Sequence, residues 1–242
     1  MTDKHYGHQV VLTGRDLSLN TLVMVARDGA KVRIAADAME RMAAARRQVE
    51  NILSGSKPVY GINTGFGAFS QESISRDQLD LLQHNLIVSH AVGVGTPLPA
   101  DAVRAMLLLR ANALCQGHSG IRPKVVELLC GMLNAGVHPV IPEQGSLGAS
   151  GDLAPLAHMA LVLMGKGEAE LGGRVMPGAE AMRLAGLETV ELQAKEGLAL
   201  INGTQMMGAV GGLAMADALM AAQLADVVAS LTVEALEGLP QA

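Results

Sequence analysis

Residues 145–158 read Gly-Ser-Leu-Gly-Ala-Ser-Gly-Asp-Leu-Ala-Pro-Leu-Ala-His. The glycines that open this stretch, together with the prolines shortly before it, predict a loop over residues 138–151. Asp152 then stands where an aspartate commonly begins a helix, directly before an apolar run. The stretch therefore predicts a bent loop that leads straight into a helix.

Helical patterns dominate on either side of this loop. Helices are predicted over residues 37–53, 75–90, 100–116 and 123–134, and a short helix and a very long helical stretch follow later. Asp37 with Glu40, and Ser75 with Gln78, have the spacing of capping boxes. The β-like segments are few and short: residues 9–12, 31–34, and a hairpin of 168–171 with 174–176 joined by two glycines. The predicted fold class is mainly α with small β elements.

The composition fits packed helices and excludes some partners. Half of the 242 residues are hydrophobic, yet only two Tyr, two Phe and no Trp occur, so Leu, Ala, Val and 14 Met must build the core. The formal charge of −5 argues against a nucleic-acid partner. The polar N-terminus predicts no signal peptide. Cys115 and Cys130 lie in apolar helical patterns, which predicts buried free thiols in a reducing cytosol.

The segment from Leu198 to Leu236 is the most apolar part of the chain. Asp217 and Asp226 interrupt it, which favours a buried helix over a membrane span of about 20 nearly uncharged residues. No Lys or Arg follows Lys195. A helix that is apolar around its circumference must be covered on most sides. We therefore expect its cover to come from other subunits, from sequence outside these 242 residues, or from both.

The loop has the residues for an unusual backbone reaction. In Ala149-Ser150-Gly151 the nitrogen of Gly151 can attack the carbonyl of Ala149 if the loop bends tightly. Loss of two waters then gives a five-membered ring with an exocyclic methylidene derived from Ser150. Small residues permit that close approach. Taken alone, the tripeptide is far more often a simple turn and a helix cap.

Three other segments carry candidate site residues. Residues 60–69 hold three of the four aromatic residues among glycines, and by themselves predict a turn with Tyr60 at its edge. Ser89 and His90 end a predicted helix, where a lone histidine is more often structural. Asn202, in Asn-Gly-Thr, is by itself a helix N-cap.

Together, residues 145–158 and these three segments resemble the aromatic amino acid ammonia-lyases and aminomutases over nearly the whole chain. The resemblance implies that Ala149-Ser150-Gly151 forms 4-methylidene-imidazol-5-one (MIO), and that no metal or nucleotide cofactor is needed. It implies that Tyr60 removes the β-proton and that Asn202 lies beside the ring and the substrate carboxylate. Tyrosine has an ordinary pKa of about 10, so this base must be activated by its surroundings.

Ser89-His90 resembles the pair found in the histidine-specific members, where it sorts substrates. A polar pair suits an imidazole, which needs hydrogen-bond partners once it is desolvated. The resemblance thus implies elimination of ammonia from L-histidine to give urocanate, with Ser89, His90 and Asn202 binding the substrate. It also implies a cytoplasmic homotetramer with no nucleic-acid or membrane partner.

The resemblance further divides the chain into an MIO-bearing domain, residues 1–200, and the start of a central bundle of long helices, residues 201–242. Family members continue well beyond this length, and their later helices supply a Tyr, a carboxylate-binding Arg and a Glu. We therefore expect a fragment with little activity alone, whose site is completed by a homo-oligomer or a complementing C-terminal chain.

Three alternatives remain open. The first is a tyrosine or phenylalanine ammonia-lyase or an aminomutase of the same family. The second is a serine hydrolase that uses Ser150, His90 and Asp152, although Asp152 replaces the last glycine of the nucleophile elbow. The third is a non-catalytic helical protein that only assembles with partners.

Overall fold

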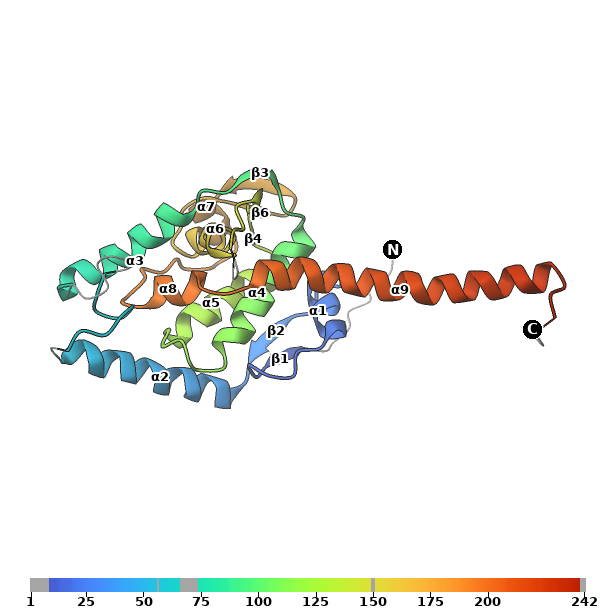
Figure 1. Ribbon diagram of the computed structural model, residues 1–242. Helices are drawn as coiled ribbons and strands as arrows, with labels where there is room; N and C mark the ends of the chain where they lie inside the picture. The colour runs from blue at the N-terminus through green and yellow to red at the C-terminus, as the bar shows by residue number, and fades with distance from the viewer. Residues whose placement is uncertain (1–8, 56, 66–73, 149–150, 240–242) are drawn as a thin grey trace.

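The computed structural model describes residues 9–55, 57–65, 74–148 and 151–239. Helices make up most of it, and the fold class is mainly α as predicted (Figure 1). The helices are α1 (Leu19–Ala26), α2 (Ala36–Ser54), α3 (Arg76–His90), α4 (Ala100–Leu114), α5 (Pro123–Ala135), α6 (Leu153–Leu163), α7 (Gly178–Leu184), α8 (Glu196–Ile201) and α9 (Gln205–Ala235). The strands are β1 (Val10–Leu12), β2 (Val32–Ile34), β3 (Val94–Pro97), β4 (His138–Pro139), β5 (Pro142–Gln144), β6 (Glu168–Leu171) and β7 (Arg174–Pro177).

The strands form three small sheets. β1 pairs with β2 in parallel, β3 pairs with β5 antiparallel, and β4, β6 and β7 form an antiparallel sheet. The β6–β7 hairpin is the one predicted around the two glycines. Two strands, β4 and β5, lie inside the segment predicted to be a loop, and both are too short to contradict that prediction.

The core centres on α4, which packs against α1, α5 and α9. Met106, Leu107 and Leu108 on α4 are fully buried, as are Leu156 and Met159 on α6. Leucine, valine, alanine and methionine supply most of the buried apolar surface, as the shortage of aromatic residues predicted. Burial of such side chains contributes roughly 1.5–3 kcal/mol each.

Two predicted helix starts are correct in position, but the predicted capping boxes do not form. α2 is capped by Ala35 without a side-chain hydrogen bond, and the side chain of Asp37 instead accepts from Arg41 at 2.5 Å. α3 follows Ser75, whose side chain makes no cap bond either. α1 was not predicted from the sequence, although Ser18 caps it by accepting from the Thr21 N–H at 3.1 Å.

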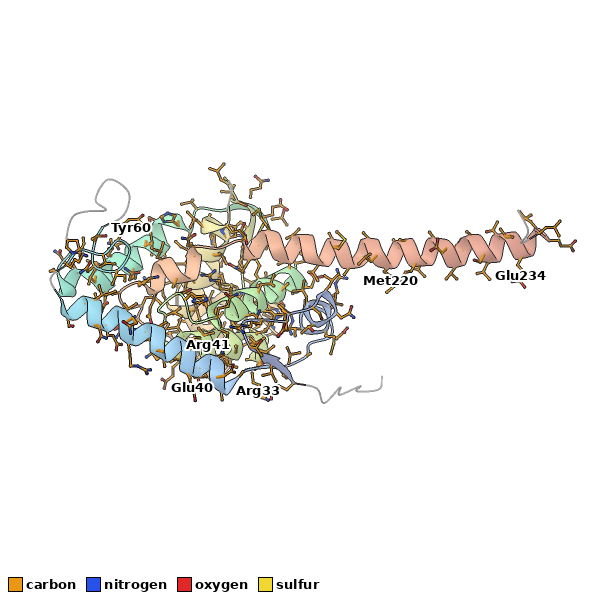
Figure 2. The ribbon with its side chains drawn as sticks, turned by 60° about the horizontal axis from the view of Figure 1, so that its bottom comes forward. Arg33, Glu40, Arg41, Tyr60, Met220 and Glu234 are labelled. Atoms are coloured by element: carbon orange, nitrogen blue, oxygen red, sulfur yellow. The ribbon has the colours of Figure 1, made fainter. Side chains whose placement is uncertain are left out.

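α9 projects far beyond the rest of the protein (Figure 1). Arg27 anchors its middle, donating to Asp217 at 2.5 and 2.9 Å and to Asp101 at 3.1 Å. Only Ala209 and Leu213 of this helix are buried. The side chain of Met220 lies on the projecting part (Figure 2) and is 57% exposed. The described residues of this chain therefore leave most of the apolar surface of α9 exposed, although its composition predicts that this surface is buried.

By length and composition, the stretch Glu196–Ala235 could cross a membrane, and it is the one such stretch among the described residues. It includes the short α8 and the non-helical residues between α8 and α9. A long apolar helix that packs inside a protein passes the same test, so the finding does not favour a membrane.

Candidate active site

The residues that flank Ala149 and Ser150 are joined to each other. Ala149 and Ser150 themselves lie outside the described part of the chain. The Leu147 N–H donates to the carbonyl of Gly151 at 2.9 Å, which brings the two flanks together. Gly148 and Gly151 have φ values of 88° and 62°, which favour glycine. The described residues on both sides of the tripeptide are thus close together, with glycine at the two positions of positive φ.

Asp152 ties this loop to α9. Its carboxylate is fully buried and accepts from the Ser146 hydroxyl at 3.2 Å and from the Met207 N–H at 3.0 Å. Asp152 precedes α6 as predicted, but its side chain makes no cap bond within that helix. A buried carboxylate is costly unless it is hydrogen-bonded. These two bonds therefore fix the loop against the first turn of α9.

The turn that carries Tyr60 is held by Asn63. The Asn63 side chain accepts from the Val59 N–H at 2.7 Å and donates to the Lys57 carbonyl at 3.0 Å. Gly61 has φ 74°, and a Cβ there would lie 3.0 Å from Cδ2 of Leu198 on α8. The predicted glycine-rich turn is confirmed and packs against α8, while Tyr60 itself is 59% exposed. Residues 66–69 of the aromatic cluster lie outside the described residues.

Ser89 and His90 end α3, as predicted. Nδ1 of His90 lies 2.8 Å from the Leu86 carbonyl and 3.2 Å from the Ser89 hydroxyl. A carbonyl can only accept, so Nδ1 carries the hydrogen and Nε2 is the acceptor of the neutral ring. In the neutral form of the ring, His90 therefore presents a hydrogen-bond acceptor at Nε2.

Asn202 closes α8 rather than opening α9. Its N–H donates to the Leu198 carbonyl at 3.0 Å, and α9 starts at Gln205 after Thr204. Its reading as a helix N-cap is therefore wrong. Two non-helical residues, Gly203 and Thr204, leave the Asn202 side chain on an exposed corner between two helices.

The side chain of Arg110 bonds to both helices at this corner, α8 and α9. It is 4% exposed, and its guanidinium donates to the Gln205 side chain at 2.7 Å and to the Ala199 carbonyl. Burial lowers its pKa to about 10, so it stays charged at neutral pH. A Cβ on Gly203 would lie 2.3 Å from this guanidinium, which explains the glycine in Asn-Gly-Thr.

α8 brings several of these segments together. The Gly197 N–H of α8 donates to the side chain of Gln83 on α3 at 3.0 Å. The next residue, Leu198, meets the Tyr60 turn at Gly61, and the helix ends at Asn202. Sequence reasoning did not identify Gln83 or Arg110 because their contacts span about a hundred residues of chain.

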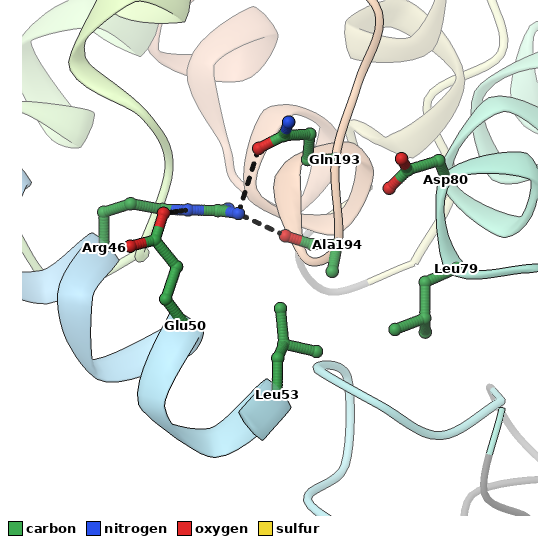
Figure 3. Close-up of a pocket in the computed structure, with 7 residues that line it drawn as sticks. All are labelled: Arg46, Glu50, Leu53, Leu79, Asp80, Gln193 and Ala194. Atoms are coloured by element: carbon green, nitrogen blue, oxygen red, sulfur yellow. Dashed lines mark hydrogen bonds and ion pairs between the residues drawn. The ribbon is translucent and has the colours of Figure 1, made fainter. Parts of the chain in front are cut away.

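A cavity of about 350 Å³ lies elsewhere, between α2, α3 and the residues before α8 (Figure 3). It is lined by Arg46, Glu50, Leu53, Leu79, Asp80, Gln193 and Ala194. Arg46 reaches across it to the Gln193 side chain at 3.2 Å and the Ala194 carbonyl at 3.0 Å. None of the candidate site residues lines this cavity, so it is not the site that the sequence indicates.

Comparison with known proteins identifies the family. The profile described as "Aromatic amino acid lyase" matches residues 17–242. The chain belongs to the aromatic amino acid lyase family. The histidine ammonia-lyase of Alkaliphilus metalliredigens is 55% identical over 231 residues, which are 96% of this chain and 46% of that protein. That of Deinococcus radiodurans is 55% identical over 228 residues, which are 94% and 44%.

Solved structures of aromatic amino acid lyase relatives share the fold. The histidine ammonia-lyase from Trypanosoma cruzi gives a TM-score of 0.89 at 42% identity, covering 96% of this chain and 45% of that one. A tyrosine aminomutase from Streptomyces globisporus gives 0.88 at 38% identity, covering 94% and 43%. The fold therefore does not separate the members of the family by substrate. The chain spans less than half the length of these relatives.

Membership of this family confirms the resemblance stated for residues 145–158 and the three other segments. The serine hydrolase alternative lacks the contact it requires. Asp152 accepts from Ser146 and Met207, and no hydrogen bond or ion pair joins it to His90 in the described structure.

Proposed function

We propose that this chain carries the MIO-forming half of a histidine ammonia-lyase, which converts L-histidine to urocanate and ammonia. Residues 1–200 form the MIO-bearing domain in this proposal, and residues 201–242 begin a central helical bundle. Sequence identity of 55% to histidine ammonia-lyases over nearly the whole chain supports this substrate. The protein is proposed to work in the cytoplasm, in keeping with its two free cysteines.

One observation carries the proposal: the pairing of strands β3 and β5 brings the Ser89-His90 segment close to residues 145–151. β3 begins at Val94, four residues after His90, and β5 ends at Gln144, directly before the loop. Val94 pairs with Gln144, so both segments leave the ladder at the same end. We call residues 145–151 the electrophilic loop, because they contain the tripeptide proposed to form MIO. A substrate bound by Ser89 and His90 would then lie close to this loop.

Glycine at position 151 supports this proposal. A Cβ there would lie 2.8 Å from the Ser146 hydroxyl, at a φ of 62° that side chains rarely adopt. Once formed from Ala149-Ser150-Gly151, the MIO ring supplies an electrophile that ordinary side chains lack.

The remaining roles fall to the chain's own side chains. Tyr60 takes the β-proton. Ser89 and the Nε2 acceptor of His90 bind the substrate imidazole, because a desolvated imidazole N–H must find an acceptor. Asn202 positions the substrate carboxylate beside the ring.

The experiment is a mass measurement on the purified chain. The intact mass and the peptide containing residues 149–151 are expected to lack two waters, and the variants Ser150→Ala and Gly151→Ala are expected to keep both. An unmodified peptide from well-folded protein would refute the proposal and favour the non-catalytic assembly alternative. Robust urocanate production by the 242-residue chain would refute a different expectation, that further residues complete the site.

We also propose that α9 is covered by other copies of the chain, as a homo-oligomer, or by a complementing C-terminal chain. Its exposed apolar residues include Met215, Leu219, Leu224, Val228 and Leu231. A surface of this size on a lone protein marks an interaction site. Light scattering on the chain alone distinguishes self-association from dependence on a second chain.

A tyrosine or phenylalanine lyase or an aminomutase is the second candidate, since a tyrosine aminomutase has almost the same TM-score. Ser89-His90 and the higher identity to histidine ammonia-lyases favour histidine. A panel of L-histidine, L-tyrosine and L-phenylalanine, with both urocanate-type and β-amino acid products measured, decides between them.

A further inference from the structure

Three segments of the chain meet closely at two glycines, Gly93 and Gly145. Gly93 follows Ser89-His90, and Gly145 opens the electrophilic loop. A Cβ on Gly145 would lie 3.1 Å from Cα of Gly93 and 3.3 Å from Cβ of Ala154 on α6. No larger residue fits there without displacing a neighbour. The two segments therefore approach each other closely at these glycines.

One side chain, that of His158 on α6, bonds to this junction. The Gly93 N–H donates to Nε2 of His158 at 3.0 Å. A Cβ on Gly93 would lie only 3.1 Å from the same Nε2. The imidazole therefore lies close against Gly93 and satisfies its backbone donor.

The bond requires one form of the imidazole. Nε2 accepts only while it has a free lone pair, so the ring is neutral and its hydrogen is on Nδ1. Burial lowers the pKa of His158 and so favours the neutral form. A protonated ring would present an N–H to the Gly93 N–H, and the bond would be lost.

We propose that His158 is a positioning residue, whose Nε2 holds the segment Ser89–Gly93 at a fixed distance from the electrophilic loop. His158 bonds to backbone and not to the residues proposed to bind substrate, so it acts through Gly93. This inference rests on the proposed function, because that function gives the two segments a common substrate. Gly93 has no side chain to pack, so this bond and the pairing of Val94 with Gln144 restrain the end of the segment that is nearest the loop.

The test measures the distance between the segments directly. Val92 and Leu147 are 67% and 88% exposed, one in each segment, and both native cysteines are buried. The variant Val92→Cys/Leu147→Cys therefore accepts two spin labels at known places, and pulsed electron resonance gives their distance distribution. The background is then changed by His158→Gln, which keeps an acceptor of similar reach, or by His158→Leu, which removes it.

We expect a narrow distribution with His158 and with His158→Gln, and loss of the narrow peak with His158→Leu. His158→Asn, whose amide is too short to reach Gly93, is expected to lose it as well, and it serves if the leucine variant does not fold. A narrow peak in the leucine or asparagine variant would overturn the proposal. So would equal broadening by His158→Gln, because rescue by the acceptor is what separates positioning from general packing.

The proposed function is checked in the same proteins by the mass of the peptide with residues 149–151. An unmodified wild-type peptide removes the lyase proposal whatever the distances are. A modified peptide with distances that do not respond to His158 removes only the positioning proposal.

Discussion

Glu196 offers the sharpest test of how the site is held. It is the first residue of α8 and is fully buried. Its carboxylate accepts from Nε and Nη2 of Arg122, both at 2.6 Å, and from the N–H groups of Arg122 at 3.0 Å and Gln193 at 2.8 Å. Arg46 lies 3.8 Å away. This one carboxylate thus anchors the helix that contacts the Tyr60 turn and ends at Asn202.

Glu196→Ala removes the carboxylate bonded to Arg122, and it also removes one of the two carboxylates near Arg46, which keeps Glu50. The side chains of Arg46 and Arg122 are only 7% and 17% exposed, so water cannot replace the lost partner fully. Removing one member of a buried ion pair costs about 3–5 kcal/mol. That is a large part of a typical unfolding free energy of about 5–15 kcal/mol. Glu196→Gln keeps the volume and some acceptor capacity, and should lose less.

Urea unfolding followed by circular dichroism measures the loss. The matched control is Glu50→Ala, which removes a partner of the same Arg46 bonded at 3.0 Å, but from a side chain that is 55% exposed. Exposed pairs contribute about 0–1 kcal/mol, so the control should stay close to wild type. If Glu196→Ala unfolds at the same urea concentration as Glu50→Ala, the anchoring role assigned to Glu196 is wrong.

Three further outcomes are expected. Burial raises the pKa of Cys115 to about 11 and that of Cys130 to about 12, so iodoacetamide should leave both thiols unmodified in the folded chain and label both in denaturant; labelling of the folded chain would contradict their burial. The pKa of His158 is lowered by burial from 6.5, so the unfolded chain takes up this proton first. Stability should therefore be complete above about pH 6.5 and fall as pH drops through the folded pKa, and His158→Gln should weaken that fall, as urea unfolding at several pH values would measure. Leu224→Glu on exposed α9 should reduce self-association in light scattering, whereas an unchanged oligomer would mean that this face is not the interface.

Local patterns predicted most of the fold. The helices from α2 to α6 and the β6–β7 hairpin lie within a few residues of where periodicity, proline and glycine indicated. α1 was missed because its run Leu-Val-Met-Val is as typical of a strand as of a helix, and only the Ser18 cap distinguishes them. The capping box at Asp37 failed because α2 begins one residue earlier, at Ala36, and the Asp37 carboxylate accepts from Arg41 instead.

The candidate site was predictable where its chemistry is local. The residues that bend the loop, Gly148 and Gly151, had to be glycine, and their positive φ values agree with that reasoning. The supports of the site were not predictable, because each joins segments that are distant in sequence. Arg110 and Ala199 are 89 positions apart, and Gly93 and His158 are 65 apart. No periodic pattern encodes such a pairing.

The placement of glycine explains how such distant supports can fix a site. Because glycine has no Cβ, the side chain of Leu198 can lie close to Gly61, that of His158 close to Gly93, and that of Arg110 close to Gly203. In each case a side chain from another element lies within 3.1 Å of where a Cβ would stand, one to three residues from a residue proposed to act on the substrate. A larger residue would push that side chain by a few tenths of an ångström or more, and catalytic groups lose efficiency when they are misplaced. The glycines that follow Tyr60, His90 and Asn202 therefore serve close packing as much as backbone freedom. An alanine at Gly93, where φ is not positive, would test packing alone, because its backbone conformation is open to any residue.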